Sequence, residues 1–251
     1  MTKTGKIAWV TGAGKGIGRA LALRLAHDGW TVAASARTAS DLAALAAEDP
    51  RIHAFALDVT DAEASQSVVA DIETRLGPLD LAVLNAGTYI PTGVAPFVPA
   101  AFTEQWRVNV GGVVTGLSHV LPPLMARKRG QIAVMSSVAG YRGLPAAGAY
   151  GATKAALINM CEALKIELEP HGIDVSVICP GFVDTPLTAR NDFPMPFLIS
   201  PDEAAGYIVK GLAARRFRIA FPPLFALIMR TLRLLPDNLF FAAARLMRRK
   251  T

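Results

Sequence analysis

The chain is poor in the residues that build disulfide frameworks and metal sites. Its 251 residues include two cysteines, Cys161 and Cys179, and four histidines that are scattered along the sequence. The cysteines fall in a predicted helix and a predicted strand without metal-ligand spacing, so we expect reduced thiols and no metal. No signal peptide is visible, which favours a cytoplasmic protein. Internal repeats and Gly/Ser-rich linkers are also lacking, so we take residues 1–251 as a single domain.

A glycine-rich turn follows the first strand-like run. Residues 7–10 are apolar, the segment TGAGKGIG comes next, and residues 19–27 carry helical periodicity. Glycines let a backbone approach a phosphate closely, and a helix N-terminus presents free N–H groups and partial positive charge to it. The spacing TGxxxGxG, formed by Gly12, Gly16 and Gly18, replaces the common GxGxxG. A turn without a ligand is the alternative, but the flanking strand and helix favour a dinucleotide site.

Three polar side chains downstream suggest chemistry beside that turn. Tyr150 and Lys154 are four residues apart in AYGATKAAL, which is predicted to be helical. Such a pair shares one helix face, with Cβ atoms about 5–6 Å apart. Ser137 lies thirteen residues before Tyr150, at the end of an apolar run. Alone, the pair would be ordinary helix surface; together with the glycine turn, the three side chains indicate an active site.

With these motifs, the chain resembles the short-chain dehydrogenase/reductase family over about residues 4–205. Further motifs occur in the family's order: LDVT with Asp58, NAG at residues 85–87, WRVNVGG with Asn109, and PGFVDT at residues 180–185. The resemblance implies a catalytic tetrad of Asn109, Ser137, Tyr150 and Lys154. Together with the cations discussed below, it gives these cofactor-binding positions: Gly12, Lys15, Gly16, Ile17, Gly18, Arg37, Asp58, Val59, Asn85, Ala86, Gly87, Tyr150, Lys154, Pro180, Gly181, Val183 and Thr185.

The order of predicted elements indicates an α/β fold. Strand-like runs lie near residues 7–10, 31–35, 53–57, 80–84, 131–136 and 173–179, with helical stretches between them and a short seventh strand near 218–221. This alternation predicts a mostly parallel sheet of six or seven strands with helices on both faces. Right-handed crossovers then give a single doubly wound, Rossmann-type domain.

The end of the second strand bears on the choice of cofactor. An acidic residue there would bind the adenosine ribose hydroxyls and repel a 2′-phosphate. This chain has Ala36 and then Arg37 at that point, and Lys15 adds a cation in the glycine turn. Two cations and no carboxylate favour NADP (NADPH), because a guanidinium can hold a phosphate in a planar fork. The alternative is that Arg37 is a solvated loop charge.

Hydride transfer to a carbonyl needs a proton donor and a group that polarises the carbonyl oxygen. Tyr150 is the predicted acid, or the base in the oxidative direction. Lys154 and the positive nicotinamide ring are expected to lower its pKa from about 10. Ser137 would act as a neutral donor to the carbonyl oxygen. The resemblance further implies that Lys154 binds the nicotinamide ribose, that Asn109 anchors a water, and that NADP usually means reduction.

Two segments occupy the positions where members of that family build the substrate pocket. Residues 88–102 and 186–199 are rich in Pro, Phe and aliphatic residues and offer no clustered charge pair. Arg190 and Asp192 are exceptions that we assign to a solvated lid surface. An apolar, lipid-like small molecule with a carbonyl or secondary alcohol group is therefore the predicted substrate.

Residues 206–251 form a basic amphipathic segment. They hold ten Lys or Arg and one acid, Asp237, so the excess of positive charge in the chain belongs to this tail. Over residues 224–235, Arg230 and Arg233 share a narrow sector of the helix and aliphatic residues fill the rest. The apolar run 219–229 is too short to span a bilayer. The side chains expected on the apolar surface are Phe225, Ile228, Leu232, Phe240, Phe241, Leu246 and Met247.

Two interpretations of this tail stay open. It can lie peripherally on the inner, anionic face of a membrane, or it can pack on the core or on a neighbouring subunit. Nucleic acid is not expected, because no base-stacking motif accompanies the charges.

The helix with Tyr150 also bears on assembly. It continues through Ala155, Leu157, Ile158, Cys161 and Leu164. Relatives pair this helix across a two-fold axis, which predicts a homodimer or homotetramer. Burial of the same residues within one chain is the alternative.

Two other functions remain to be weighed against an enzyme: a non-catalytic NADP-binding regulator and a membrane-docked interaction module.

Overall fold

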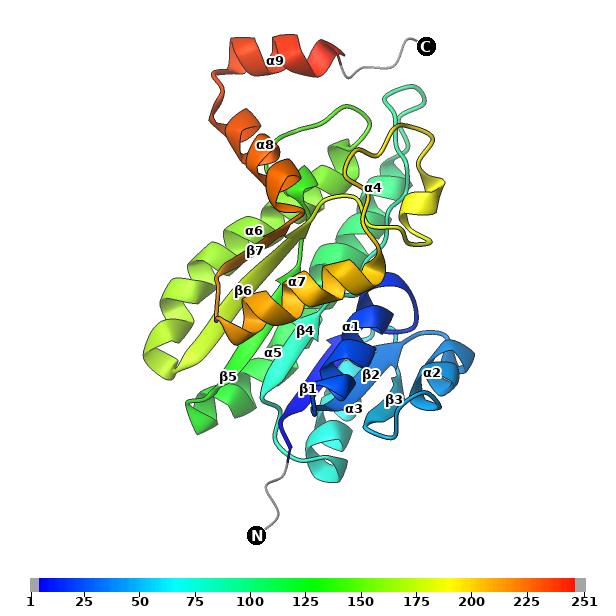
Figure 1. Cartoon of the computed structure of the whole chain (residues 1–251), viewed down its shortest axis with the longest axis vertical. Coiled ribbons are helices and arrows are strands. Elements are labelled where there is room, and N and C mark those ends of the chain that lie inside the picture. The colour runs from blue at the N-terminus through cyan, green and yellow to red at the C-terminus, as the bar shows by residue number, and fades with distance from the viewer. Residues whose placement is uncertain (1–4, 247–251) are drawn as a thin grey trace.

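The structure is a computed structural model that describes residues 5–246, in which strands and helices alternate (Figure 1). Its strands are β1 (Ile7–Thr11), β2 (Thr31–Ala36), β3 (Ile52–Ala56), β4 (Leu81–Leu84), β5 (Gly130–Met135), β6 (Ile173–Pro180) and β7 (Arg218–Phe221). Its α-helices are α1 (Gly16–His27), α2 (Ala39–Ala46), α3 (Ala62–Arg75), α4 (Pro99–Trp106), α5 (Gly112–Arg127), α6 (Gly148–Leu168), α7 (Pro201–Ala213), α8 (Pro223–Leu234) and α9 (Asp237–Leu246). The strand predicted near 218–221 is β7.

The strands form one parallel sheet in the order β3-β2-β1-β4-β5-β6-β7. The chain begins at β1, moves outward to β3, returns to β4 beside β1 and then continues to the other edge. The strand order therefore reverses between β1 and β4, and open α/β sheets bind ligands beside the carboxyl ends of strands at such a point. The predicted doubly wound, Rossmann-type fold is confirmed.

Helices cover both faces of the sheet (Figure 1). On one face α1 packs against α7, and leucines of α2 join the same apolar cluster. Residues of α3, α5 and α6 form the cluster on the opposite face. Strand β1 shows why its sequence is apolar throughout: Val10 belongs to the first cluster and Trp9 to the second, and both are fully buried. A strand that is covered on both faces needs apolar residues at every position.

Residues Pro99–Arg127 form a continuous helical stretch that is long and apolar enough to cross a membrane by length and composition. Its apolar positions Val113, Leu117, Val120 and Leu124 are buried in the domain. Helix α5 packs against β4, β5 and α3, which accounts for the hydropathy of the segment.

Part of the surface of α6 that was predicted for a subunit interface belongs instead to the core. Leu157, Ile158 and Cys161 are at most 4% exposed and pack in the same cluster as residues of β6. Ala155 is exposed and Leu164 is half-buried. Burial within one chain is thus the right alternative for the first three residues. The outward side of α6 includes Ala152, Ala155, Asn159 and Ile166.

The tail packs back on the domain through one side of α8 and α9. Met229 of α8 and Phe240 of α9 are buried, and Phe240 lies 4.3 Å from the Arg142 guanidinium. Arg142 also forms an ion pair with Asp237. Helix α8 ends at Leu234, just before the predicted break at Pro236. The expectation that Phe240 faces a membrane is therefore wrong, and Phe225 and Leu232 are half-buried and pack against the core. Met247 and the Leu246 side chain lie outside the described part of the chain.

Candidate active site

The glycine turn connects β1 to α1 at the carboxyl edge of the sheet. Gly12 has a φ of +66°, and a Cβ there would lie 2.8 Å from the Ala86 Cα atom. A Cβ at Gly18 would lie 2.3 Å from the Gly12 carbonyl oxygen. The side chain of Ile17 packs against the core and so anchors the turn. The close contacts require glycine, so a bare backbone faces the N-terminus of α1, as a pyrophosphate site needs.

Asn85 fastens this turn to the end of β4. Its side-chain Nδ2 donates to the carbonyl oxygens of Thr11 at 2.8 Å and Gly12 at 3.3 Å. The Thr11 hydroxyl accepts hydrogen bonds from the backbone N–H groups of Asn85 and Ala86 at 2.9 and 3.0 Å. The structure therefore places the NAG motif beside the turn, with Asn85 in a positioning role. Thr11 is the first residue of the predicted TGxxxGxG motif, but its bonding to the NAG segment was not predicted, because the two segments are more than seventy residues apart.

Residues 180–185 adjoin the glycine turn from the end of β6. A Cβ at Gly16 would lie 3.0 Å from Thr185 Cγ2, so the two segments are in close contact. The Thr188 hydroxyl donates to the Val183 carbonyl at 2.5 Å and accepts from the Thr185 N–H at 3.0 Å. The backbone N–H of Gly181 donates to the Phe221 carbonyl at 2.7 Å. These bonds fix the predicted PGxxxT segment against the turn.

Gly87 brings the NAG motif to the predicted tetrad. A Cβ at Gly87 would lie 3.1 Å from Asn109 Oδ1 and 3.6 Å from Lys154 Nζ. Asn109 is fully buried in a π-helical turn, Arg107–Gly111, between α4 and α5. Its Oδ1 accepts from the Thr88 N–H at 2.7 Å, and its Nδ2 donates to the Thr88 carbonyl at 3.0 Å and to Thr153 Oγ1 at 3.1 Å. Such π-turns often mark functional sites.

Asn109 therefore holds the segment after β4 against α6. That is a positioning role, and the water-anchoring role implied by the resemblance stays a prediction. The π-turn itself was missed, because an extra residue in a helical turn leaves no trace in hydrophobic periodicity.

Lys154 lies inside the protein, with 3% of its surface exposed. Its Nζ donates to the Met135 carbonyl at the end of β5, at 2.8 Å, and lies 5.5 Å from the centroid of the Tyr150 ring. Burial lowers its pKa to about 8. Most of the lysine is thus still protonated at neutral pH, and its ammonium group is positioned by a backbone oxygen.

Ser137 and Tyr150 complete the group. Ser137 caps the short turn Val138–Gly140; its hydroxyl donates to the Pro180 carbonyl at 3.3 Å and accepts from the Ala139 N–H at 3.1 Å. Burial raises the pKa of Tyr150 to about 12, a hydrogen bond with Ser137 acts in the lowering direction, and neighbouring Tyr89 raises it further. The Tyr89 ring meets the Tyr150 ring edge-on at 5.3 Å.

The pKa of Tyr150 differs from the expectation that Lys154 lowers it. In this structure the Lys154 ammonium is directed at the Met135 carbonyl, and burial of the phenol dominates. The predicted four side chains nevertheless come together: Asn109 and Lys154 face Gly87, the Lys154 Nζ lies 5.5 Å from the centroid of the Tyr150 ring, and Ser137 is near enough to Tyr150 to affect its pKa.

The ends of β2 and β3 lie at the predicted adenosine end of the site. Asp58 Oδ1 accepts from the Thr60 N–H at 3.0 Å and from its hydroxyl at 2.8 Å. The Thr60 backbone bond is the main cause that lowers the pKa of Asp58, and the charge of Arg37 contributes. Arg37 is exposed, and its charge acts on the Asp58 carboxylate. Val59 packs against Gly112, where a Cβ would lie 2.6 Å from Val59 Cγ2.

The expectation that no carboxylate lies near the two predicted cations is wrong. The sequence predicted two cations and no carboxylate, but Asp41 in the first turn of α2 forms an ion pair with Lys15, at 3.3 Å. A Cβ at Gly14 would lie 3.2 Å from Asp41 Cβ and 3.3 Å from Ala36 Cβ. A carboxylate therefore does reach the glycine turn, from a helix rather than from the end of β2. Arg37 is left as the cation on which a preference for a 2′-phosphate depends.

These residues fit a nicotinamide dinucleotide. Gly12, Gly16 and Gly18 offer bare backbone for the pyrophosphate. The ends of β2 and β3 would hold the adenosine, and Gly87, Lys154 and residues 180–185 would hold the nicotinamide half. All of them follow the carboxyl ends of parallel strands, where this fold binds dinucleotides.

An aromatic cluster stands above the end of β6. Phe182 lies 5.9 Å from Phe193 and 5.5 Å from Phe225, and Phe197 lies 5.8 Å from Phe225. Phe225 belongs to α8, and its Cδ1 would lie 2.5 Å from a Cβ on Gly181. The tail therefore contributes to the predicted substrate side of the site. This contribution was not predicted, because residues 186–199 and Phe225 are separated in the sequence and meet only in the folded chain.

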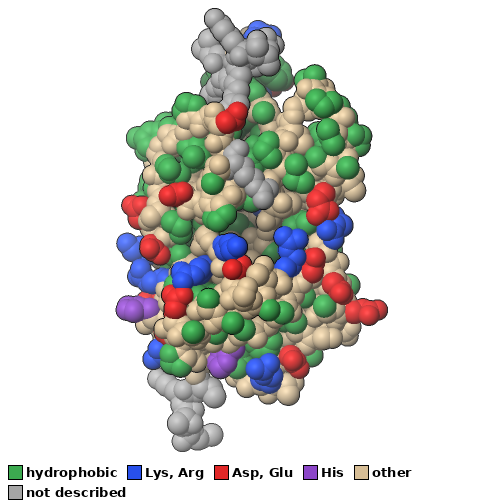
Figure 2. All heavy atoms as spheres, turned by 90° about the vertical axis from the view of Figure 1, so that its right-hand side faces the viewer, with side chains coloured by type: hydrophobic (Ala, Val, Ile, Leu, Met, Phe, Trp, Pro, Cys, Tyr) green, Lys and Arg blue, Asp and Glu red, His purple; other side chains and the backbone are tan. Residues whose placement is uncertain are grey.

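The surface over the two predicted pocket segments is also apolar. Figure 2 shows hydrophobic side chains gathered on the upper part of this face, and charged side chains mainly across its middle and lower parts. Exposed residues there include Val94 at 89%, Phe97 at 59% and Phe197 at 44%. Asp192, which was assigned to a solvated lid surface, is exposed and also makes an interaction within the protein. The side chain of Arg190 lies outside the part of the chain that the structure describes.

Fold and site together define a dinucleotide-binding α/β protein with a Ser, Tyr and Lys group beside the cofactor turn. Residues 6–193 match the short chain dehydrogenase family. An uncharacterized oxidoreductase of Myxococcus xanthus is 39% identical over 247 residues, which cover 97% of this chain and 98% of that protein. The chain belongs to the short-chain dehydrogenase/reductase family and is an oxidoreductase of that family.

Solved structures agree with this assignment. A short-chain dehydrogenase from Streptomyces avermitilis is similar with a TM-score of 0.83 and 29% identity, over 98% of this chain and 96% of that one. A single-substitution variant of actinorhodin polyketide ketoreductase, solved with NADPH, is similar with a TM-score of 0.79 and 26% identity, over 87% of this chain and 95% of that one.

Proposed function

We propose that the protein is an NADPH-dependent reductase that converts a carbonyl group of an apolar small molecule into a secondary alcohol. The observation that carries the proposal is the convergence of Ser137, Tyr150 and Lys154 beside the glycine turn. Ser137 lies close enough to Tyr150 to act on the pKa of its phenol, and Lys154 Nζ lies 5.5 Å from the centroid of the Tyr150 ring. A protein that only bound the dinucleotide would have no need for this group.

Tyr150 is the proposed proton donor. Because its pKa is raised to about 12, it is a neutral phenol at working pH and holds the proton that a developing alkoxide needs. Ser137 is the second donor to the carbonyl oxygen, since its hydroxyl acts on Tyr150 and can rotate away from the Pro180 carbonyl to which it now donates. Two donors directed at one oxygen would stabilise the charge that forms there.

Lys154 is proposed to stabilise the phenolate that remains after the proton is given. Its ammonium group is buried close to the Tyr150 ring, where a charge interaction is stronger than in water. It would also bind the nicotinamide ribose hydroxyls. The nicotinamide itself, when bound, supplies the hydride. Gly87 leaves room for Lys154 Nζ, because a Cβ there would lie 3.6 Å from it. Asn109 would support Lys154 indirectly, since it bonds to Thr153 on the same helix.

The preference for NADPH over NADH rests on Arg37. This residue is exposed at the end of β2, where Ala36 leaves room and brings no acid. Its guanidinium can hold a 2′-phosphate in a bidentate arrangement. Lys15 would assist, although its pairing with Asp41 reduces its contribution.

The apolar character of the substrate is inferred from the aromatic cluster. Phe182, Phe193, Phe197 and Phe225 surround the segment that follows β6, next to Gly181. Apolar walls with a few polar groups are typical of small-molecule sites. The class we propose is a lipid-like ketone or aldehyde, with the reverse oxidation available when the supply of cofactor reverses.

We also propose a homo-oligomer. The outward side of α6 carries small residues and Ile166, which is 74% exposed, so two copies of this helix can approach each other closely.

The experiment that tests the reaction is a panel of hydrophobic ketones, aldehydes and secondary alcohols, with nicotinamide absorbance followed for NADPH and NADH separately. Turnover of an apolar carbonyl with NADPH supports the proposal. Tight NADPH binding without turnover of any member of the panel would favour the alternative of a non-catalytic regulator.

A further inference from the structure

The side of α8 that faces away from the core carries exposed aliphatic side chains together with two arginines. Leu224 and Leu227 are 57% and 58% exposed, and Ile228 is 40% exposed. Phe225, next to Leu224, contacts Phe197 of the loop after β6. The apolar surface therefore continues into that loop, where Phe197 and Leu198 are each 44% exposed. We call these five exposed residues, Leu224, Leu227, Ile228, Phe197 and Leu198, the docking face.

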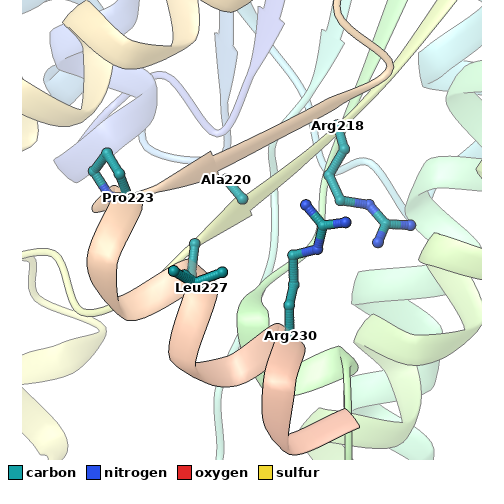
Figure 3. Close-up of a pocket in the computed structure, with 6 residues that line it drawn as sticks. Arg218, Ala220, Pro223, Leu227 and Arg230 are labelled. Atoms are coloured by element: carbon teal, nitrogen blue, oxygen red, sulfur yellow. The ribbon is translucent and has the colours of Figure 1, made fainter. Parts of the chain in front are cut away.

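A basic pocket adjoins the docking face. A cavity of about 280 Å³ between β7 and α8 is lined by Arg218 and Arg230, and its other lining residues include Leu227 (Figure 3). Both guanidinium groups reach into the same space in this view. Leu227 belongs to both features, so cations and aliphatic side chains meet on one side of the helix.

The pocket has more positive than negative charge. Arg218 donates to Glu162 at 2.7 Å, but its Nε is buried and has no hydrogen-bond partner among the described residues. Arg230 is exposed and forms no hydrogen bond or ion pair with another described residue. Arg218 has one carboxylate partner and Arg230 has none among the described residues, so donors remain for an anionic oxygen, and a phosphate accepts such donors in a planar fork.

The docking face lies at the same end of the molecule as the active site. Helix α8 follows the carboxyl end of β7, and the loop with Phe197 follows the carboxyl end of β6. The glycine turn and Ser137 follow the carboxyl ends of β1 and β5. A surface bound to the docking face would therefore lie next to the aromatic cluster on the substrate side of the site.

We propose that the docking face binds the surface of an anionic phospholipid bilayer, with the Arg218 and Arg230 pocket taking a lipid phosphate. Exposed aliphatic side chains beside arginines are what an interfacial helix uses: the apolar side chains enter the headgroup boundary and the cations contact anionic lipid. Arg233 and Arg245 are further exposed cations on α8 and α9. The only acid on these two helices, Asp237, is already paired with Arg142.

A second copy of the chain fits this face less well. A two-fold contact places the same patch on both subunits, so the Arg218 and Arg230 pockets of both copies would be brought into one interface. Like charges brought together in this way weaken the contact, whereas an anionic lipid surface neutralises them.

The test is co-sedimentation of the full-length protein with vesicles of phosphatidylglycerol and phosphatidylcholine, compared with phosphatidylcholine alone. Deletion of residues 220–251 is unsuitable, because it removes the buried core residues Phe221 and Met229. Single substitutions on the exposed side avoid this. Leu227→Ser and Arg230→Gln are matched by Val114→Ser and Lys128→Gln, which change an exposed apolar residue of α5 and an exposed cation just after α5, both outside the docking face.

The wild-type protein should bind the anionic vesicles more strongly than the neutral ones, and less strongly as salt is added. Arg230→Gln should lower the partition coefficient about fivefold and Leu227→Ser roughly tenfold, while both controls match the wild type. Vesicle binding is measured without turnover, so the result does not depend on the proposed reaction. NADPH binding by each variant verifies that it is folded.

Three results would overturn the proposal. The first is negligible binding of the wild type to anionic vesicles. The second is an equal loss of binding in the two variants and in their controls. The third is a lower oligomeric mass for Leu227→Ser without any binding of the wild type to vesicles, which would assign the docking face to contacts between copies.

Discussion

Lys154 holds an ammonium group in the interior, and this should cost stability. The side chain is 3% exposed, and burial lowers its pKa from 10.5 to about 8. Below pH 8 both the folded and the unfolded chain are protonated here, and the folded one bears the full desolvation penalty. The gap between the two pKa values corresponds to about 3 kcal/mol at pH 7.

Replacement of Lys154 by methionine should therefore stabilise the protein while it abolishes turnover. Methionine fills a similar volume without charge, but it leaves the Met135 carbonyl without its donor, which costs about 1–2 kcal/mol. The net expectation is a gain of about 1–2 kcal/mol in the free energy of unfolding at pH 7. The group acts in catalysis at the expense of the fold, as many active-site residues do.

The stability difference between Lys154→Met and the wild type should also depend on pH. Between pH 8 and 10.5 the unfolded chain still binds the Lys154 proton and the folded chain does not, so the stability of the wild type rises with pH in this window. The advantage of Lys154→Met should then shrink by about 1 kcal/mol between pH 7 and pH 9.

Urea unfolding of cofactor-free protein at pH 7 and pH 9 measures this, with Lys128→Met as a control at an exposed lysine. The control should show no gain at either pH. The reasoning is refuted if Lys154→Met is less stable than the wild type at pH 7, or if its advantage is the same at both pH values.

Three other expectations can be checked with standard assays. Ala36→Asp combined with Arg37→Leu should shift the ratio of NADPH to NADH affinity toward NADH by at least about tenfold, since it removes the phosphate contact and adds a repulsive carboxylate; wild-type protein that already binds NADH more tightly would contradict this. Asp41→Asn frees Lys15 from its ion pair, so NADPH should bind about two- to fivefold more tightly in a fluorescence titration. An unchanged affinity would mean that Lys15 does not reach the phosphate. Light scattering at micromolar concentration should give at least twice the monomer mass, and a monomer would refute the oligomer.

The sheet was predictable because its strands are buried on both faces. Runs such as IAWV and VSVICP are apolar at nearly every position, and their bounds in the structure agree with the sequence estimate to within one or two residues. The glycine turn was equally predictable, since Gly12, Gly16 and Gly18 occur where close backbone contacts exclude larger residues.

Features made by residues far apart in the sequence were not predictable. Asp41 meets Lys15 only because α2 folds back beside the glycine turn. Phe225 joins Phe182 and Phe197 because α8 packs over the end of β6. The pKa of Tyr150 depends on burial in the folded protein, which the spacing of Tyr150 and Lys154 does not encode.

The interface predicted on α6 shows the same limit. The sequence pattern of Leu157, Ile158 and Cys161 suits a subunit contact as well as a core, and only the three-dimensional packing decides that these side chains face β6.

The most direct test of the central claim is NADPH-dependent turnover by Tyr150→Phe, measured on the best carbonyl substrate of the panel. The variant keeps the ring that contacts Tyr89 but lacks the proton that we assign to the reaction. We predict a rate at least about 100-fold below the wild type, with NADPH binding unchanged. A rate close to that of the wild type would contradict the role of Tyr150 as the acid and, with it, the proposed mechanism.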